Sequence, residues 1–328
     1  MRFVIYGAGA VGGAIGARLF QAGHEVVLIG RGAHLDAIRN RGLRFQTPEE
    51  DVVLPIEAVG HPREIDWQPD DVVILTMKTQ DTEPALRELE TFAGTGVPVV
   101  CAQNGVENER LAARRFQSVY AMLVALPATF LVPGEVIASA TPLSGCLHAG
   151  VYPGGVDATI TAICAALAAS RYRCEPSADA MALKYRKLMH NLGNGLDVVT
   201  GRMAWGADGE LGQFTAQLRA EAAACYQAAG ITAVSQEEYT DRVQRHYKAM
   251  PVGGQQRNGS STLQSVLRGS TTIEVDYLNG EIELLGKLHG VPTPYNSAVR
   301  RAATLMAARG DKPGSLSLAE LALMAVSS

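Results

Sequence analysis

Three glycines near the start of the chain have the spacing of a phosphate-binding turn. They belong to the run Gly7-Ala8-Gly9-Ala10-Val11-Gly12, which follows an apolar stretch and precedes an alanine-rich one. In a strand–turn–helix unit, Gly7 would make the tight turn, Gly9 would let the backbone approach a pyrophosphate, and Gly12 would let helix and strand pack closely. Residues 24–29 supply a second strand, so the pattern predicts a dinucleotide-binding unit with the phosphates at a helix N-terminus.

Arg31 follows that second strand, at the position where the nucleotide is usually selected. NAD sites carry Asp or Glu here to bind the ribose hydroxyls, whereas this chain has Gly30-Arg31-Gly32 and no carboxylate before Asp36. A guanidinium binds phosphate through parallel hydrogen bonds, and the local sequence holds no carboxylate that would repel it. We therefore expect Arg31 to contact the 2′-phosphate of NADP; a solvated surface arginine is the plainer alternative.

A second group of polar side chains lies in the middle of the chain. Residues 182–194 have helical character, and steps of three and four place these amines and amides on one face: Lys184, Lys187, Asn191 and Asn194. The alternative is the solvated face of an amphipathic helix, which explains most such stripes. Gly193 and Gly195 favour a site, because glycine costs about 1 kcal/mol relative to alanine in a helix and suggests the close approach of another group.

A third group begins at Ser261 and includes Glu274. Thr272 is expected to cap a helix and to put Glu274 in its first turn, where a carboxylate stabilises the helix dipole. The residues alone favour this structural role for Glu274 over a catalytic one.

The elements around these groups alternate between strands and helices in the first half of the chain. Residues 71–76 and 97–101 are apolar runs of the buried-strand type, with a helical stretch at 82–91 between them. This alternation predicts an α/β fold with a doubly wound, mostly parallel sheet of the Rossmann type, in which ligands bind beyond the carboxyl ends of the strands. Lys78 and Asn104 follow two of those ends and are candidate cofactor contacts; a solvated lysine and a turn asparagine are the alternatives.

From Cys174 to about Ala308 the pattern is predominantly helical, so a chain of 328 residues is expected to form two domains. We place an NADP-binding Rossmann domain at residues 1–172 and an all-helical substrate domain at residues 173–328. The tail at 311–328 is apolar enough to suggest a short docking helix.

The composition argues against several classes of protein. The net charge is −4 with acids and bases interspersed, so we expect no nucleic-acid partner and no attraction to anionic lipid. No apolar run approaches the roughly 18 residues of a membrane span, and the first residues enter a strand directly, which suggests a cytoplasmic location. The five cysteines lack metal-ligand spacing and are expected to be reduced core residues.

Taken together, the motifs resemble the ketopantoate reductase (2-dehydropantoate 2-reductase) family. The resemblance rests on the glycine turn, Lys78, Gln103-Asn104-Gly105, the helix with Lys187 and Asn191, and Ser261-Thr262-Leu263-Gln264 leading to Glu274-Val275-Asp276-Tyr277-Leu278-Asn279-Gly280. It covers nearly the whole chain in order. Its most specific parts are the lysine helix and the last segment, because many oxidoreductases share the glycine turn.

The resemblance implies NADPH-dependent reduction of a 2-oxo acid, most directly of 2-dehydropantoate to pantoate in pantothenate and coenzyme A synthesis, in a cleft between the two domains. Lys187 would be the general acid, and Glu274 would hold a substrate hydroxyl or orient the lysine. The remaining candidate residues would bind the substrate (Asn191, Asn194, Ser261, Asn104) or the cofactor (the residues from Gly7 to Gly12, Arg31, Lys78, Asn104). No metal is required, and a homodimer is left open.

Two departures from the family pattern bear on the substrate. Family members usually carry an asparagine eight residues after the lysine, where this chain has Gly195, and an aspartate where it has Ser265. Two alternatives therefore stay open: a reductase of another 2-oxo or β-oxo acid, and an NADP(H)-binding regulator that no longer turns over. The presence of both Lys187 and Glu274 argues against the regulator.

Overall fold

A computed structural model describes residues 1–204, 206–254 and 259–326 of the chain. Contacts between Cα atoms divide the chain into two compact units, Met1–Lys184 with Ser235–Arg257 and Tyr185–Val234 with Asn258–Ser328. The first unit thus continues past the boundary predicted at residue 172 and takes in a segment from the later half of the chain. The division falls inside helix α6 (Ala180–Asn191).

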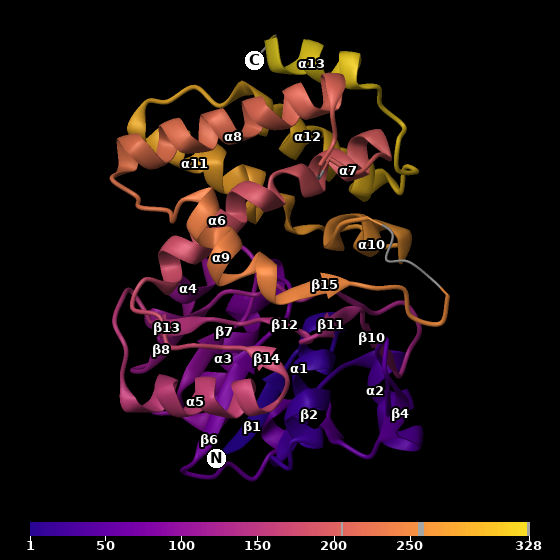
Figure 1. Cartoon of the computed structure of the whole chain (residues 1–328), viewed down its shortest axis with the longest axis vertical. Coiled ribbons are helices and arrows are strands. Elements are labelled where there is room, and N and C mark those ends of the chain that lie inside the picture. The colour runs from indigo at the N-terminus through magenta and orange to yellow at the C-terminus, as the bar shows by residue number, and fades with distance from the viewer. Residues whose placement is uncertain (205, 255–258, 327–328) are drawn as a thin grey trace. The chain divides into compact units, whose positions relative to one another are not determined.

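A seven-stranded sheet forms the centre of the first unit, in the order β13-β8-β7-β6-β1-β2-β5 (Figure 1). Its strands are β1 (Arg2–Tyr6), β2 (Val26–Ile29), β5 (Glu57–Val59), β6 (Asp71–Leu75), β7 (Val99–Cys101), β8 (Val119–Met122) and β13 (Ala149–Val151). Neighbouring strands are parallel except β8 and β13. The strand order reverses between β1 and β6, the place where doubly wound sheets bind their ligands.

The connections between these strands carry most of the helices of the first unit. They are α1 (Ala10–Gln21), α2 (Gly32–Arg41), α3 (Thr82–Ala93), α4 (Asn108–Ala113) and the 3-10 turns η1 (Pro62–Glu64) and η2 (Thr79–Asp81), and α5 (Ala158–Ala169) follows the last strand, β13. The predicted Rossmann-type alternation of strand and helix is confirmed.

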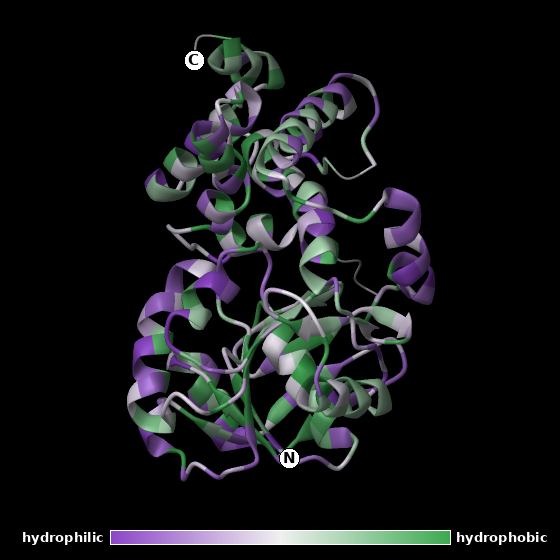
Figure 2. Ribbon diagram, turned by 90° about the vertical axis from the view of Figure 1, so that its left-hand side faces the viewer, coloured by the Kyte–Doolittle hydropathy of each residue, from purple (hydrophilic) through white to green (hydrophobic). Residues whose placement is uncertain are grey.

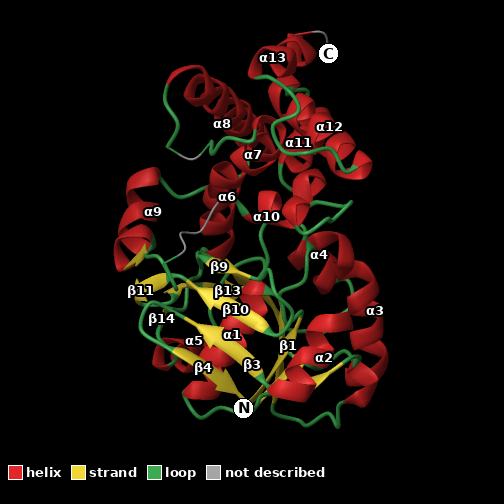
Figure 3. Cartoon of the chain, turned by 90° about the vertical axis from the view of Figure 1, so that its right-hand side faces the viewer, coloured by secondary structure: helices red, strands yellow, loops and turns green. Residues whose placement is uncertain are grey.

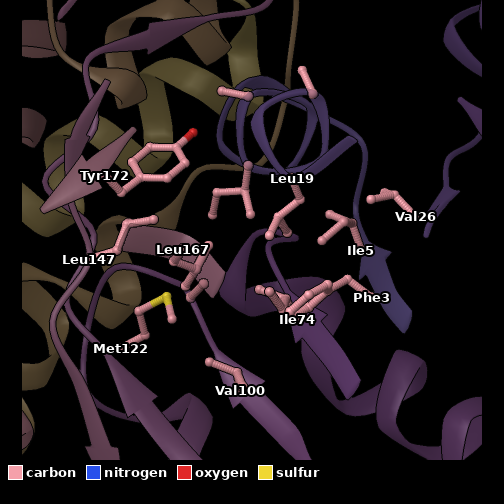
Figure 4. Close-up of a cluster of buried hydrophobic side chains, with 14 of the residues drawn as sticks. Phe3, Ile5, Leu19, Val26, Ile74, Val100, Met122, Leu147, Leu167 and Tyr172 are labelled. Atoms are coloured by element: carbon pink, nitrogen blue, oxygen red, sulfur yellow. The ribbon is translucent and has the colours of Figure 1, made fainter. Parts of the chain in front are cut away.

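Both faces of the central sheet are buried, which explains why its strands are almost continuously apolar. On β1, Phe3 and Ile5 enter one core cluster and Val4 enters the other, as the two-residue period of a strand requires. The first cluster also takes Leu19 from α1 and Leu167 from α5 (Figure 4). Figure 2 shows the strands of this unit in green, while purple gathers on the helices outside them.

A second, four-stranded sheet packs against α1 in the order β4-β3-β10-β9. Its strands are β3 (Leu43–Gln46), β4 (Asp51–Leu54), β9 (Ala128–Thr129) and β10 (Glu135–Ala138), and a separate pair joins β12 (Gly145–Cys146) to β14 (Tyr172–Arg173). Helix and sheet approach closely: a Cβ added to Gly13 would lie 2.7 Å from Cγ2 of Val136.

A segment from the later half of the chain completes the first unit. It contains α9 (Gln236–Arg242), η3 (Gln244–His246) and β15 (Tyr247–Ala249), and β15 pairs antiparallel with β11 (Ala140–Pro142). His148 also donates a hydrogen bond from Nε2 to the carbonyl of Arg242, at 2.9 Å. The prediction of an all-helical domain at residues 173–328 is wrong over this segment, which belongs to the first unit and contains β15. A strand this short has no periodic signature, and it pairs with residues far earlier in the chain.

Among its described residues the second unit contains helices and connecting loops but no strand, and the yellow strands of Figure 3 all belong to the first unit. Its elements are the end of α6, α7 (Gly193–Thr200), α8 (Gly209–Ala229), α10 (Ser261–Leu267), the 3-10 helix η4 (Glu274–Tyr277), α11 (Asn279–His289), α12 (Pro294–Arg309) and α13 (Leu318–Val326). The predicted tail helix is present as α13, which packs on α12 and buries Leu321 and Ala325.

The cysteines match their prediction, since each of the five is a buried free thiol. Within the described residues, no helix combines the length and the apolar character needed to cross a bilayer.

Candidate active site

The glycine turn between β1 and α1 has the geometry expected of it. Gly7 has φ +113°, and a Cβ added there would lie 2.7 Å from the backbone nitrogen of Met77. A Cβ added to Gly12 would lie 2.2 Å from the carbonyl oxygen of Gly7. Both positions therefore require glycine, Gly7 for its backbone conformation and Gly12 for the contact between helix and turn.

Gly9 differs from these two glycines. A Cβ added to Gly9 would meet no atom of the structure within 4 Å, and Gly9 is also the N-cap residue of α1. The first turn of α1 contains no acidic residue, so the free N–H groups of the helix face no competing carboxylate there. Ala8, Ala10 and Val11 complete the turn. This open cradle at a helix N-terminus fits the pyrophosphate of a dinucleotide.

His34 holds the same turn from α2, and sequence reasoning missed it. Its Nδ1 accepts a hydrogen bond from the Gly134 N–H at 2.8 Å, so its Nε2 carries the proton and donates to the Ala8 carbonyl at 2.7 Å. Burial lowers the pKa of His34, which favours this neutral form. A histidine within an amphipathic helix has no sequence signal that separates such a brace from an ordinary core residue.

Arg31 stands directly before α2, as its N-cap residue, and its side chain is 86% exposed. Its Nη2 lies 3.1 Å from Oδ2 of Asp81. The expectation that no carboxylate lies near Arg31 is therefore wrong: Asp81 comes from η2, which follows β6, and the tertiary fold brings it to the end of β2. Any phosphate bound by Arg31 would share the guanidinium with this carboxylate.

Lys78 and Asn104 lie in the loops that follow the adjacent strands β6 and β7. Lys78 is the half-buried N-cap residue of η2. The Asn104 carbonyl accepts a hydrogen bond from Nδ2 of Asn108 at 3.2 Å, and Gly105 after it has φ +77°. Both predicted residues thus lie at the carboxyl edge of the sheet, in the first unit.

Lys184 is not part of a polar ligand-binding face. Its side chain is 3% exposed, forms an ion pair with the fully buried Glu109, and donates to the Gln103 carbonyl at 3.0 Å. Periodicity alone placed Lys184 beside Lys187, because it does not distinguish a solvated lysine from one that is buried and paired. Lys184 belongs to the compact first unit, whereas Lys187 belongs to the second.

The predicted single helix from 182 to 194 is two helices. α6 ends at Asn191 and α7 begins at Gly193, although Leu192 between them keeps helical angles of φ −59° and ψ −27°. Lys187 and Asn191 share α6, and Asn194 lies on α7. Asn191 is 6% exposed, and its Nδ2 has no hydrogen-bond partner among the described residues.

Gly195 explains one departure from the family pattern. A Cβ added there would lie 2.7 Å from Cγ1 of Val299 and 3.0 Å from Cγ2 of Val275. An asparagine at position 195 would therefore require the side chains of Val275 and Val299 to shift. The same packing places α7 against η4, the element that begins at Glu274.

Glu274 is the first residue of η4, and it is 4% exposed. The N-cap position belongs to Ile273, so the prediction that Thr272 caps this helix is wrong. A buried carboxylate on a four-residue 3-10 helix gains little from a helix dipole, because few peptide units are aligned. The dipole role that the residues first favoured for Glu274 loses most of its physical basis.

Ser261 is the first residue of α10, after the N-cap residue Ser260. The Ser260 hydroxyl lies 3.5 Å from the Asn194 carbonyl, and it also hydrogen-bonds to Asp197, a buried carboxylate on α7. Asp197 accepts from the Ala204 N–H at 2.7 Å, and burial raises its pKa. Asp197 was not among the predicted residues, yet it ties the helix of Asn194 to the start of the helix of Ser261.

The predicted residues of the second unit lie on four elements: Lys187 and Asn191 on α6, Asn194 on α7, Ser261 on α10 and Glu274 on η4. Helix α7 contacts both α10 and η4. Ammonium and amide groups can donate to a substrate oxygen that gains negative charge, and the carboxylate can accept from a substrate hydroxyl. The cofactor candidates all lie in the first unit.

Two family models match the chain. "Ketopantoate reductase PanE/ApbA" matches residues 3–151, and "Ketopantoate reductase PanE/ApbA C terminal" matches residues 179–307. A 2-dehydropantoate 2-reductase of Archaeoglobus fulgidus is 27% identical over 297 residues, which cover 90% of this chain and 94% of that protein. A 2-dehydropantoate 2-reductase of Mesorhizobium japonicum is 38% identical, over 32% of each protein.

Solved structures share the fold over nearly the full chain. A PanE/ApbA family ketopantoate reductase from Ralstonia eutropha JMP134 is 26% identical, with a TM-score of 0.77, and the match covers 94% of this chain and 99% of that one. D-mandelate dehydrogenase in complex with NADH and anilino(oxo)acetate has a TM-score of 0.80 at 24% identity over the same shares of both chains. Since the two family models together span most of both units, the chain belongs to the ketopantoate reductase family of oxidoreductases.

Proposed function

We propose that this protein uses NADPH to reduce the ketone of a 2-oxo acid to the 2-hydroxy acid, and that 2-dehydropantoate is the substrate to test first. The observation that carries the proposal is the buried Nδ2 of Asn191, which has no partner among the described residues and lies one helical turn after Lys187. Leaving a buried donor unsatisfied costs about 1 to 3 kcal/mol, and a polar substrate group would remove that cost.

Lys187 is the proposed general acid. NADPH, when bound, supplies the hydride that is added to C2 of the substrate. The carbonyl oxygen then becomes an alkoxide, and the Lys187 ammonium stabilises this charge and donates the proton that completes the hydroxyl. The lysine is left as a neutral amine, which takes up a proton from solvent before the next turnover.

The remaining residues have binding roles in the proposal. Asn191, Asn194 and Ser261 hold polar groups of the substrate, and Glu274 holds a substrate hydroxyl or orients Lys187. On the cofactor side, the glycine turn binds the pyrophosphate and Arg31 binds the 2′-phosphate, while Lys78 and Asn104 lie near the nicotinamide. The cytoplasmic location and the homodimer stay predictions.

Substrate identity is the open part of the proposal. Gly195 and Ser265 depart from the family pattern at positions near the substrate residues, so another 2-oxo or β-oxo acid is the second candidate. Loss of NADPH absorbance with ketopantoate and a panel of other 2-oxo acids separates the two. Ketopantoate should give the highest kcat/KM. Tight NADPH binding without turnover on any acid would instead support the regulator.

A further inference from the structure

The two loops expected to carry Lys78 and Asn104 are joined by buried side chains. Nε2 of Gln103 donates to the Met77 carbonyl at 3.0 Å and to Oγ1 of Thr82 at 2.8 Å. Oγ1 of Thr82 donates to Oδ1 of Asn108 at 2.8 Å, and Nδ2 of Asn108 donates to Oγ1 of Thr79 at 3.2 Å. Each bond connects the segment after β6, residues 77–82, to the segment after β7, residues 103–108.

A buried ion pair lies next to these bonds. Lys184 pairs with Glu109, the neighbour of Asn108, and its Nζ also donates to the carbonyls of Cys101 and Gln103. We call the whole set the loop-anchoring cluster: Thr79, Thr82, Gln103, Asn108, Glu109 and Lys184. All six side chains are less than 5% exposed.

A gain in the stability of the fold does not explain why these polar side chains are buried together. Buried polar and charged groups lose their hydration, and well-packed apolar side chains are often as stable or more stable in their place. A hydrogen-bonded cluster has directions that apolar packing lacks, so it fixes the positions of the backbone segments it joins. Here those segments flank Lys78 on one side and Asn104 on the other.

We propose that Thr82 and Asn108 are positioning residues, which hold the loops of Lys78 and Asn104 in the one arrangement that supports hydride transfer. The proposal rests on the proposed function, because it takes these two loops to lie at the nicotinamide. Neither Thr82 nor Asn108 touches the substrate or the cofactor in this account. Both act through the backbone of the loops.

Thr82→Val tests the proposal, because it keeps the shape of the side chain and removes the hydroxyl that Gln103 and Asn108 share. At saturating NADPH, kcat should fall about tenfold or more, since small misplacements of reacting groups cost rate. The dissociation constant of NADPH should change less than about threefold, because the lost hydroxyl bonds to Gln103 and Asn108 and not to the glycine turn or Arg31. Thr82→Ser, which keeps the hydroxyl, should restore kcat.

Thr47→Val is the matched control. Thr47 is 5% exposed, and its Oγ1 accepts from the N–H groups of Glu49 and Glu50, in the turn between β3 and β4. The Thr47→Val variant should lower the melting temperature as Thr82→Val does, but leave kcat unchanged. If both variants lose only melting temperature, the proposal is wrong.

Amide hydrogen exchange of the nucleotide-free protein is the second readout. Residues 77–82 and 103–108 should exchange faster in Thr82→Val than in the wild type and in Thr47→Val. Unchanged exchange would overturn the proposal, even if the wild type reduced no 2-oxo acid and the proposed function failed separately. Should Thr82→Val fail to fold, Gln103→Leu removes two of the joining bonds and carries the same expected results.

Discussion

At the scale of single residues, Lys187 is the side chain whose removal most directly tests the chemistry. Lys187→Ala should lower kcat by about 100-fold or more and leave NADPH affinity nearly unchanged, because its charge matters most when the substrate oxygen becomes negative. Steady-state kinetics and a nucleotide titration measure the two quantities.

Lys287→Ala is a suitable control for Lys187. Lys287 is 71% exposed on α11, in the same unit, and pairs only with Glu283 one turn away among the ion pairs of the described residues. Lys184 lies closer in sequence but is buried, so its variants report on folding instead. Equal loss of activity in Lys187→Ala and Lys287→Ala would contradict the assignment of the acid.

Glu274→Gln separates a substrate role from a structural one. The amide keeps the volume of a side chain that is 4% exposed but removes its charge, so kcat/KM should fall at least about tenfold while the melting temperature changes little. The loss should be larger for ketopantoate, which carries a distal hydroxyl, than for a 2-oxo acid without one. An equal loss with both substrates would indicate that Glu274 orients Lys187, and no loss would return it to a structural role.

The variants Arg31→Ala and Asp81→Asn should change the preference for NADPH over NADH in opposite directions. Arg31→Ala should reduce the preference for NADPH over NADH by about 1.5 to 3 kcal/mol, the value of a charge-assisted contact with phosphate. Asp81→Asn removes the carboxylate beside Arg31 and should increase that preference. Arg39→Ala on the same helix is the control, since Arg39 pairs with Glu64 instead. The measurement is kcat/KM with each nucleotide.

At the scale of elements, the ion pair of Lys184 and Glu109 joins α6 to α4. Lys184→Ala would leave Glu109 charged or protonated in a buried site, and the free energy of unfolding should fall by about 3 to 5 kcal/mol. The double variant Lys184→Met with Glu109→Leu removes both charges and should recover most of that loss. Denaturant unfolding checks both, and a double variant no more stable than Lys184→Ala would argue against the pair as the cause.

Most of the glycine turn could be predicted from sequence because the positive φ of Gly7 and the approach of Gly12 to the Gly7 carbonyl arise within six consecutive residues. The contact of Gly7 with Met77 comes from a loop 70 residues away and could not be predicted. Lys184 shows the opposite case: its periodic spacing with Lys187 is real, but its partner is 75 residues away in the chain. No local sequence pattern distinguishes a lysine in a buried ion pair from a lysine on the solvated face of a helix.

For the candidate site residues of the second unit, the sequence predicted helical surroundings but not the exact elements. The break between α6 and α7 at Leu192 and the start of η4 at Glu274 depend on packing, as the close fit of Gly195 against Val275 and Val299 illustrates. The same packing leaves little room for a side chain at position 195, where the family pattern has asparagine. Sequence comparison could register the missing asparagine but not the close fit around Gly195.

At the scale of the whole molecule, two buried histidines should make the fold sensitive to mild acid. His34 and His148 each accept a backbone N–H at Nδ1 and donate from Nε2, and burial lowers the pKa of both. At pH 7.5, about one unit above the ordinary histidine pKa, these side chains are mostly neutral in the folded and unfolded states alike. As the pH falls further, the unfolded chain takes up protons before the folded one does, so stability should decrease.

Denaturant unfolding at pH 7.5 and pH 5.5 measures this effect. Asp197 and Glu221 oppose it, because burial raises the pKa of each carboxyl and so favours the folded state as the pH falls. The comparison must therefore be with the double variant His34→Gln and His148→Gln, which should lose less stability between the two pH values than the wild type. An equal loss would assign the acid sensitivity to other groups.

The segment that returns to the first unit also determines the order in which the protein can assemble on the ribosome. β11 has no partner strand until β15 has been made, and His148 lacks the carbonyl of Arg242 until then. At roughly 5 to 20 residues per second, the stretch between Lys184 and β15 takes several seconds to synthesise. During that interval residues 185–234 of the helical unit are synthesised, while β11 in the first unit still lacks its partner. The first unit therefore cannot complete its strand pairing until part of the second unit has been made.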